Sequence, residues 1–370
     1  MKSISRPSLA ALAVSAAAAL ALTACGGSSG GASGDNELTV AFAGAVNAPK
    51  EDVATYAVAK DQGFLDAEKL KVKTINADGS SAAIQAVASR SADITAADVG
   101  SILAAKEKGV PIKAIGGLVQ NWPWRIAVKP DSPIKSGTDL KGKKIGVISL
   151  ASGSAPYAKA FAKDAGLDGD KDVDLLPVGI GTPAASALSS GKVDALALYT
   201  APYASIENSG TKLRYLPNSP AFQGIRSLTF AAREDTIKKK KDELTRYLRA
   251  AYQGVLFSAV QPEGAMKIGF KTFPAMLSGQ SAEQRLTGDT KVLTSFVESA
   301  TPAAGEPDSF SDWGAISDAE WSKTMAYTKD AGQITKDVKV TDVFDPSLLA
   351  AANKFDAAQV IAKAKAYAPA

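Results

Sequence analysis

A segment with the order strand, small-residue loop and helix occurs twice in this chain, and this repeat constrains the fold more than any other feature. The later copy is Lys141 to Leu167, with the sequence KGKKIGVISLASGSAPYAKAFAKDAGL, and the earlier copy is Leu38 to Phe64. Tyr56 and Tyr157, one in each copy, are 101 residues apart. A unit that recurs with the same element order predicts two similar lobes.

The same spacing extends beyond these copies. Residues 80–93 align with residues 181–194 at an offset of 101, with identities at Ala83/Ala184, Ala86/Ala187, Ser89/Ser190 and Asp93/Asp194. Short β-rich runs alternate with Ala-rich helical runs, which predicts an α/β fold with largely parallel strands. The expected strands are Leu38–Phe42, Lys71–Asn76, Ile94–Ala96, Ile112–Leu118, Arg125–Lys129, Lys144–Ile148, Val173–Val178, Ala195–Tyr199 and Leu213–Leu216.

Helices are expected between these strands and throughout the last third of the chain. A return strand over Ala221–Arg233 precedes long amphipathic runs, which we expect to cover the first lobe as a helical layer. The expected helices are Lys50–Asp61, Ser81–Arg90, Gly100–Lys108, Ala155–Asp164, Pro183–Gly191, Ala201–Ser209, Asp235–Ala259, Pro262–Phe270, Ala282–Ala300, Asp318–Ala331 and Pro346–Tyr367.

Composition excludes many kinds of chemistry. The 370 residues contain no histidine and one cysteine, so Ser-His-Asp and Cys-His nucleophiles, His-ligated metal sites and internal disulfides are ruled out. The phosphate-binding, dinucleotide-binding and nucleophile-elbow motifs are also missing. Without Lys2 and Arg6 the basic and acidic residues nearly balance, which leaves no nucleic-acid footprint. We therefore expect a protein that is not an enzyme and that has no cofactor and no metal.

The first 36 residues have the pattern of an exported lipoprotein. Residues 1–24 combine Lys2 and Arg6, an apolar run and small residues, as in a signal peptide. Leu22-Thr23-Ala24-Cys25 is similar to a bacterial lipobox, which predicts lipidation at Cys25; an ordinary cleaved signal with an incidental cysteine is the alternative. Residues 25–36 then form a Gly/Ser-rich flexible linker. The expected location is outside the cytoplasmic membrane, lipid-anchored at the cell surface or in the periplasm.

Several motifs resemble the substrate-binding proteins of the nitrate/sulfonate/taurine class, a group related to receptors for thiamine-pyrimidine precursors. They are the stretches Ala57–Leu65, Ala86–Ile94, Asp139–Val147, Ala187–Ala195 and Asp345–Leu349. The resemblance implies the type 2 periplasmic-binding-protein fold, with two α/β lobes joined by two crossing segments near Trp124–Val128 and Gly224–Phe230. It also implies a monomeric, membrane-anchored ABC-transporter receptor. The expected lobes are residues 37–124 with 226–370, and residues 125–225. A related pyrimidine synthase needs histidine chemistry, which this chain lacks.

Loops that follow strands in both lobes are the expected ligand site, because ligands of open α/β sheets bind beyond the carboxyl ends of strands. Ser80, Ser81 and Thr182 lie where they could cap helices, either for that purpose alone or while also meeting a ligand. Trp122 and Trp124 could stack on a planar ligand or simply pack in the crossover. The candidate ligand-binding residues are Gly44, Asn47, Ser80, Ser81, Asp98, Trp122, Trp124, Ser149, Ser152, Ser154, Thr182 and Tyr199.

The predicted function is delivery of a small solute to an ABC permease and its ATPase by hinge closure. Small-residue loops and helix N-termini favour an organic anion, such as a sulfonate or an aromatic or aliphatic carboxylate. A neutral heteroaromatic solute, such as a pyrimidine, is the alternative. A surface enzyme acting through carboxylates such as Asp98 is a third hypothesis, and a sensory role would use the same closure.

Overall fold

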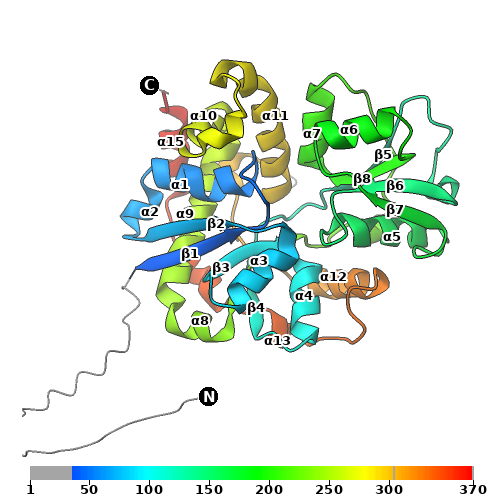
Figure 1. The fold of residues 1–370 in the computed structure, drawn as a ribbon. Helices are drawn as coiled ribbons and strands as arrows, with labels where there is room; N and C mark the ends of the chain where they lie inside the picture. The colour runs from blue at the N-terminus through cyan, green and yellow to red at the C-terminus, as the bar shows by residue number, and fades with distance from the viewer. Residues whose placement is uncertain (1–35, 303–304, 369–370) are drawn as a thin grey trace, which may run out of the picture. The chain divides into compact units, whose positions relative to one another are not determined.

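In the computed structural model, which describes residues 36–302 and 305–368, the chain forms two five-stranded sheets (Figure 1). The signal, lipidation and linker predictions fall on residues outside these ranges, apart from Asn36. The first sheet has the order β2-β1-β3-β10-β4, and the second has the order β7-β6-β8-β5-β9. Their bounds are β1 Glu37–Phe42, β2 Lys71–Asn76, β3 Ile94–Asp98, β4 Ile112–Gly117, β10 Leu228–Arg233, and β5 Trp124–Val128, β6 Lys143–Val147, β7 Val173–Pro177, β8 Ala195–Tyr199, β9 Arg214–Tyr215.

The two sheets repeat the same pairing pattern. β1 is parallel to β2 and β3, and β6 is parallel to β7 and β8. In each sheet the fourth strand runs antiparallel: β10 pairs with β3 and β4, and β5 pairs with β8 and β9. The sequence repeat therefore corresponds to two equivalent α/β lobes, in agreement with the predicted fold class.

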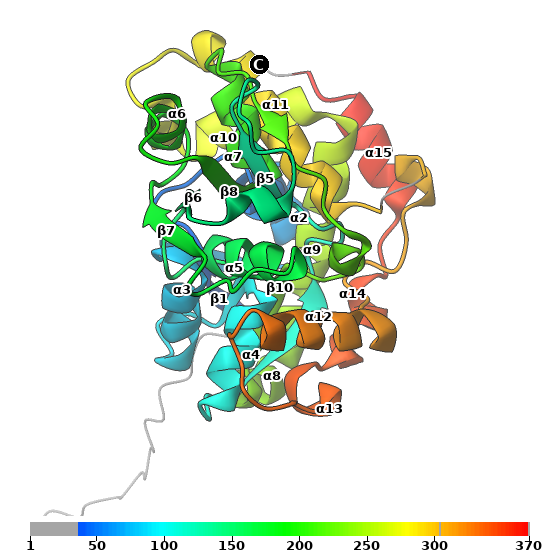
Figure 2. The same ribbon diagram turned by 90° about the vertical axis from the view of Figure 1, so that its right-hand side faces the viewer.

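Helices flank both sheets (Figures 1 and 2). In the first lobe they are η1 Asp52–Ala57, α1 Val58–Asp61, α2 Phe64–Ala67, α3 Gly79–Ala88 and α4 Val99–Glu107, and in the second they are η2 Gly137–Leu140, α5 Ser154–Asp164, α6 Thr182–Ser189, α7 Thr200–Asn208 and η3 Pro220–Phe222. After β10 come α8 Glu234–Lys239, α9 Lys241–Val260, α10 Pro262–Thr272, η4 Pro274–Leu277, α11 Ala282–Ala300, η5 Pro307–Ser309, α12 Asp318–Asp330, α13 Val340–Val343, η6 Pro346–Leu348, α14 Leu349–Ala352 and α15 Ala357–Lys365.

Three expectations about these elements were wrong in detail. The return strand begins at Leu228 rather than Ala221, because Pro220 opens a short 3-10 helix there. The expected helix Pro346–Tyr367 is broken into η6, α14 and α15, with Asp356 capping the last of them through the N–H of Gln359. The helix expected over Lys50–Asp61 starts as a π-helix, η1, all of whose residues are buried. Such wide turns are common at functional sites.

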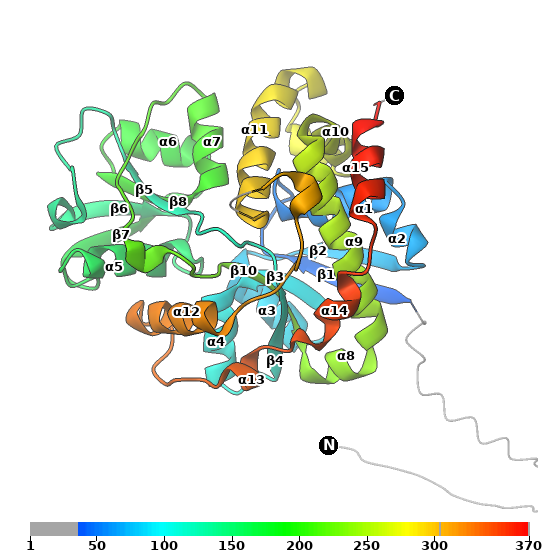
Figure 3. The same ribbon diagram turned by 180° about the vertical axis from the view of Figure 1, so that it is seen from behind.

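The last third of the chain covers the first sheet but also contacts the second lobe. Helix α9 packs along η1 and α15, and its buried face joins the core of the first lobe. Helix α11 lies against α7, and α12 lies against both α4 and α5 (Figures 2 and 3). The helical layer therefore braces both lobes, whereas the sequence indicated only the first. Among the described residues, no helix is both long enough and apolar enough to span a membrane.

Candidate ligand-binding site

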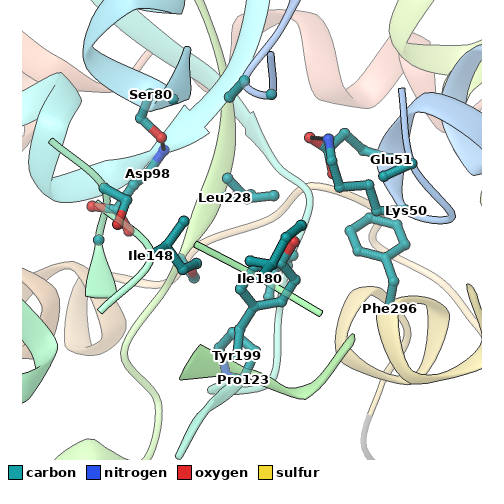
Figure 4. Close-up of a pocket in the computed structure, with 18 of the residues that line it drawn as sticks. Lys50, Glu51, Ser80, Asp98, Pro123, Ile148, Ile180, Tyr199, Leu228 and Phe296 are labelled. Atoms are coloured by element: carbon teal, nitrogen blue, oxygen red, sulfur yellow. Dashed lines mark hydrogen bonds and ion pairs between the residues drawn. The ribbon is translucent and has the colours of Figure 1, made fainter. Parts of the chain in front are cut away.

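A cavity of about 370 Å³ lies between the two sheets, and both lobes build its walls (Figure 4). Segments that follow β1, β2, β3, β6, β7 and β8 all reach it, as do residues of the two connections between the sheets, 118–123 and 216–227. Its lining residues are Ala43–Val46, Ala48, Lys50, Glu51, Asp78–Ser80, Asp98, Val119, Pro123, Trp124, Ile148, Ser149, Ser152, Gly153, Gly179, Ile180, Tyr199, Thr200, Ser227, Leu228, Phe296 and Ser299. The carboxyl ends of the parallel strands thus meet at one cavity.

The structure brings most of the candidate residues to this cavity. Those that line it are Gly44, Ser80, Asp98, Trp124, Ser149, Ser152 and Tyr199. Asp98 is the last residue of β3 and Tyr199 is the last residue of β8. Each lobe therefore contributes one polar side chain to the cavity from the same position in the fold. Trp124, the first residue of β5, packs edge-on against the Tyr199 ring, with 5.6 Å between ring centroids.

The remaining candidates, Asn47, Ser81, Trp122, Ser154 and Thr182, lie outside the cavity. Trp122 stacks on Phe222 and contacts Tyr157 and Tyr327, as expected for a packed crossover. Ser81 is exposed on α3, Thr182 is exposed at the start of α6, and Asn47 lies beside a neighbouring cavity.

The expected serine and threonine caps were wrong. Ser80 and Ser81 lie inside α3, whose N-cap is Asp78, and Thr182 is the first residue of α6 after Gly181; neither helix has a side-chain cap bond. Ser80 instead accepts a hydrogen bond from the backbone N–H of Asp98, at 3.0 Å. This bond fixes the end of β3 against α3 inside the first lobe.

The loop after β6 is held by hydroxyl groups. The Ser154 hydroxyl is buried and accepts the Ile148 N–H at 2.9 Å, and it lies 2.8 Å from the Ser152 hydroxyl. Ser152 also donates to the Ser149 carbonyl at 2.9 Å. Ser154 therefore supports the loop from behind, while Ser149 and Ser152 form its cavity face.

Asp98 is a buried carboxylate in the cavity wall. Its Oδ1 accepts the Gly100 N–H at 3.1 Å, which caps α4. Burial raises the pKa of Asp98 to about 6, although the N–H groups of Ser101 and Gly100 and the Gln333 side chain lower it. A β-carbon at Gly153 would lie 3.1 Å from the Asp98 Oδ2, so the second lobe comes very close to this group.

Lys50 forms a buried cluster at another part of the cavity. Its Nζ lies 2.5 Å from Glu51 and 2.7 Å from Asp52. Burial lowers the pKa of Lys50, but the charges of Asp52 and Glu51 outweigh this effect and raise it. Burial raises the pKa of Glu51, opposed by Lys50 and reinforced by Asp52. Figure 4 places Lys50 and Glu51 apart from Asp98 and Ser80, with Ile148, Ile180 and Leu228 between them.

Sequence reasoning missed several lining residues. Lys50 and Glu51 are charged, as is typical of an exposed helix start. The only sequence signal for a place in the cavity wall is that they come just after a strand and its small-residue loop. Phe296 and Ser299 come from α11, in a region expected to serve packing only. Ser227 and Leu228 belong to the second crossing, where no sequence signal separates a hinge residue from a wall residue.

Comparisons with known proteins agree with this architecture. The family model described as "NMT1/THI5 like" matches residues 50–265, which is more than half of the chain. The chain belongs to the NMT1/THI5-like family. A curated relative, the riboflavin-binding protein RibY of Chloroflexus aurantiacus, is 24% identical over 245 residues, spanning 66% of each chain. The resemblance stated from the sequence is thereby confirmed.

Solved structures share the fold of this family member. The alkanesulfonate-binding protein SsuA of Xanthomonas axonopodis pv. citri, bound to MOPS, has a TM-score of 0.61 at 18% identity, with 86% of this chain and 97% of that chain covered. The desulfurization enzyme DSZB has a TM-score of 0.52 at 16% identity, with 85% and 98% covered. The chain has the periplasmic-binding-protein fold, and at such identities the likeness concerns the fold alone.

Proposed function

We propose that this family member is the solute-binding receptor of an ABC importer and that it closes over a small organic solute. The observation that carries the proposal is a single cavity lined by both lobes and by both connections between them. Ligand binding there is coupled to the angle between the lobes, because a ligand can contact both lobes at once only when they are closed. The moving parts would be residues 37–124 with 226–370, and residues 125–225.

Contacts between the lobes support closure as the mechanism. Gly153 of the second lobe lies against Asp98 of the first and against Trp124. On another side of the cavity, the Thr200 hydroxyl of α7 donates to the Ser295 carbonyl of α11 at 3.3 Å. Helix α7 of the second lobe also packs along α11, and Ala201 of α7 belongs to the apolar core of the first lobe. The two lobes therefore touch on more than one side of the cavity, as a closed arrangement requires.

The charge of the solute can be argued from the lining groups. Among the described lining residues, Lys50 is the only lysine or arginine, and it is already paired with two carboxylates. An organic anion, the class that the sequence favoured, would lie near Asp98 and Glu51 with no uncommitted cation facing it. A neutral heteroaromatic solute avoids that conflict, and Asp98 could accept an N–H group from it. This observation favours the second candidate.

A thermal-shift screen tests the receptor and its ligand class together. The chain without residues 1–36 would be scanned with alkanesulfonates, aromatic carboxylates, nitrate, pyrimidines and flavins. A ligand at about 100 times its Kd stabilises the folded state by about 2.7 kcal/mol, which raises Tm measurably. Stabilisation by anions alone would contradict the heteroaromatic assignment. Release of a chemically altered product at catalytic rates would contradict the receptor and favour a surface enzyme.

Membrane attachment forms a separate part of the proposal. We expect Cys25 to be lipidated, the mature protein to lie outside the cytoplasmic membrane, and the folded part to be monomeric. Expression of the full chain and of Cys25→Ser, followed by membrane fractionation, tests the anchor: the variant should move to the soluble extracytoplasmic fraction. Light scattering of the folded part tests the oligomeric state.

A further inference from the structure

A second cavity, of about 290 Å³, adjoins the first. The two share the side chains of Val46, Ala48, Lys50, Ile180 and Tyr199 as common walls. Val46 belongs to the loop after β1 and Ile180 to the loop after β7, so both lobes contribute to this boundary as well. Val46 is 71% exposed and Ile180 is 43% exposed, although both are apolar. Two of the five shared side chains, Val46 and Ile180, are thus not packed into the core of either lobe, whereas Lys50 is buried.

The second cavity has a charged pair in its lining. Arg285 and Asp289 of α11 form a two-pronged pair, in which Nε and Nη2 of Arg285 each lie 2.9 Å from an Asp289 oxygen. Asp289 is buried, and the Arg285 side chain is partly exposed. Residues of α7, Ser205 among them, also line this cavity.

This pairing limits the chemistry that the second cavity would recognise. The charges of Arg285 and Asp289 compensate each other, so a charged group would have to compete with the existing pair. The Nη1 donors of Arg285 lie outside the pair, and a carboxylate has lone pairs beyond those used here. A hydroxyl group both donates and accepts, so a chain of hydroxyls suits such a wall without any net charge.

We propose that the second cavity holds the hydroxylated tail of an elongated solute whose planar head lies in the first cavity. The inference rests on the proposed receptor function and narrows its substrate class. The solute would cross the boundary between Val46 and Ile180, beside Tyr199 and the buried Lys50 cluster. Closure of the lobes would then clamp the solute at two places, once at each cavity.

Matched probes with and without a hydroxylated tail test this inference. The pairs are lumiflavin with riboflavin, adenine with adenosine, and cytosine with cytidine, each titrated by calorimetry. In at least one pair, we expect the tailed member to bind about tenfold more tightly, equivalent to one or two net hydrogen bonds. Equal affinities within every pair whose head binds would overturn the second cavity as a tail site while leaving the receptor function intact.

A variant that fills the second cavity sharpens the test. Ser205→Trp introduces a large side chain from α7 into this cavity alone, and Glu207→Trp is the matched control on an exposed position of the same helix. Ser205→Trp should reduce the affinity of the tailed probe to that of its tailless partner, without changing the partner's affinity. Equal loss for both probes, or no loss for either, contradicts the proposal. If none of the six probes binds while another solute in the thermal screen does, the inference fails and the receptor stands.

Discussion

Asp98 and Tyr199 are structural equivalents, 101 residues apart, and they face one cavity from opposite lobes. Asp98 is the last residue of β3, which pairs in parallel with β1, and Tyr199 is the last residue of β8, which pairs in parallel with β6; each is followed at once by a helix. Burial raises the pKa of both side chains, so the phenol stays neutral and the carboxyl titrates near pH 6. Two lobes of the same fold therefore present different chemistry to one cavity.

The raised pKa of Asp98 predicts a pH-dependent stability. The pKa of the Asp98 carboxyl is 3.8 in the absence of the fold and about 6 in the folded chain. Its contribution to the free energy of unfolding is therefore fully present below the ordinary carboxyl pKa and is lost as the pH rises through 6. Asp98→Asn keeps a cap for α4 and removes the buried charge. We expect the variant to exceed the wild type in unfolding free energy by up to about 3 kcal/mol at pH 7.5. The difference should vanish near pH 4.

Chemical denaturation across pH 4 to 8 measures this effect. Asp78→Asn serves as the control, because Asp78 is exposed on the same side of the first lobe. Its stability curve should follow that of the wild type. Parallel curves for Asp98→Asn and wild type would show that the Asp98 carboxyl is not held in an unfavourable environment.

The sequence predicted the lobes better than it predicted the site. Alternation of β-rich and Ala-rich runs depends on local periodicity, so strands such as Ala195–Tyr199 were found with their bounds. The repeat at an offset of 101 was visible up to Asp93 and Asp194 and predicted two similar lobes, and the structure extends the equivalence to Asp98 and Tyr199. Both signals are local or periodic, and the fold preserves them.

What the sequence could not predict depends on tertiary contacts. Ser154 and Ser152 are two residues apart in one loop, yet only Ser152 lines the cavity, because the Ser154 hydroxyl turns back to the Ile148 N–H. Phe296 reaches the cavity although it lies 174 residues beyond Trp122, which packs outside the cavity. The direction of such a side chain depends on the residues that pack against it in the folded chain, and a local sequence pattern does not predict those residues.

A methyl group at Gly153 should hold the lobes apart. Its β-carbon would lie 2.9 Å from the Trp124 ring and 3.1 Å from Asp98. The φ angle of Gly153 is −61°, so alanine adds no backbone strain and the effect is steric. We expect Gly153→Ala to weaken solute binding about tenfold or more, equal to about 1.4 kcal/mol. Small-angle scattering should show a more open chain in the presence of solute.

Gly288→Ala provides the control for this substitution. It lies within α11, where a β-carbon would meet nothing closer than 3.5 Å, so alanine should leave affinity unchanged and slightly favour the helix. Unchanged affinity in Gly153→Ala would indicate that this contact does not form in the solute-bound state.

Ser154 and Thr182 should behave differently when each is replaced by alanine. Ser154→Ala removes the acceptor for the Ile148 N–H in a buried loop, which costs about 1–3 kcal/mol of unfolding free energy. Thr182 is exposed and has no cap bond, so Thr182→Ala should change stability by less than about 0.5 kcal/mol. Urea denaturation measures both. A loss of solute affinity in Thr182→Ala would return this residue to the binding site.

The Lys50 cluster should be essential for stability because its carboxylates have so little access to water. Lys50→Met leaves Glu51 and Asp52 buried without their cation, which costs about 3–5 kcal/mol at neutral pH. Lys73→Met is the control, since the Lys73–Glu37 pair is exposed and should contribute less than about 1 kcal/mol. Adding Asp52→Asn to Lys50→Met should recover part of the loss, because it removes one of the two uncompensated charges. Equal unfolding free energies for the Lys50 and Lys73 variants would mean that water reaches the cluster. The pairing of Lys50 would then no longer favour a neutral solute over an anion.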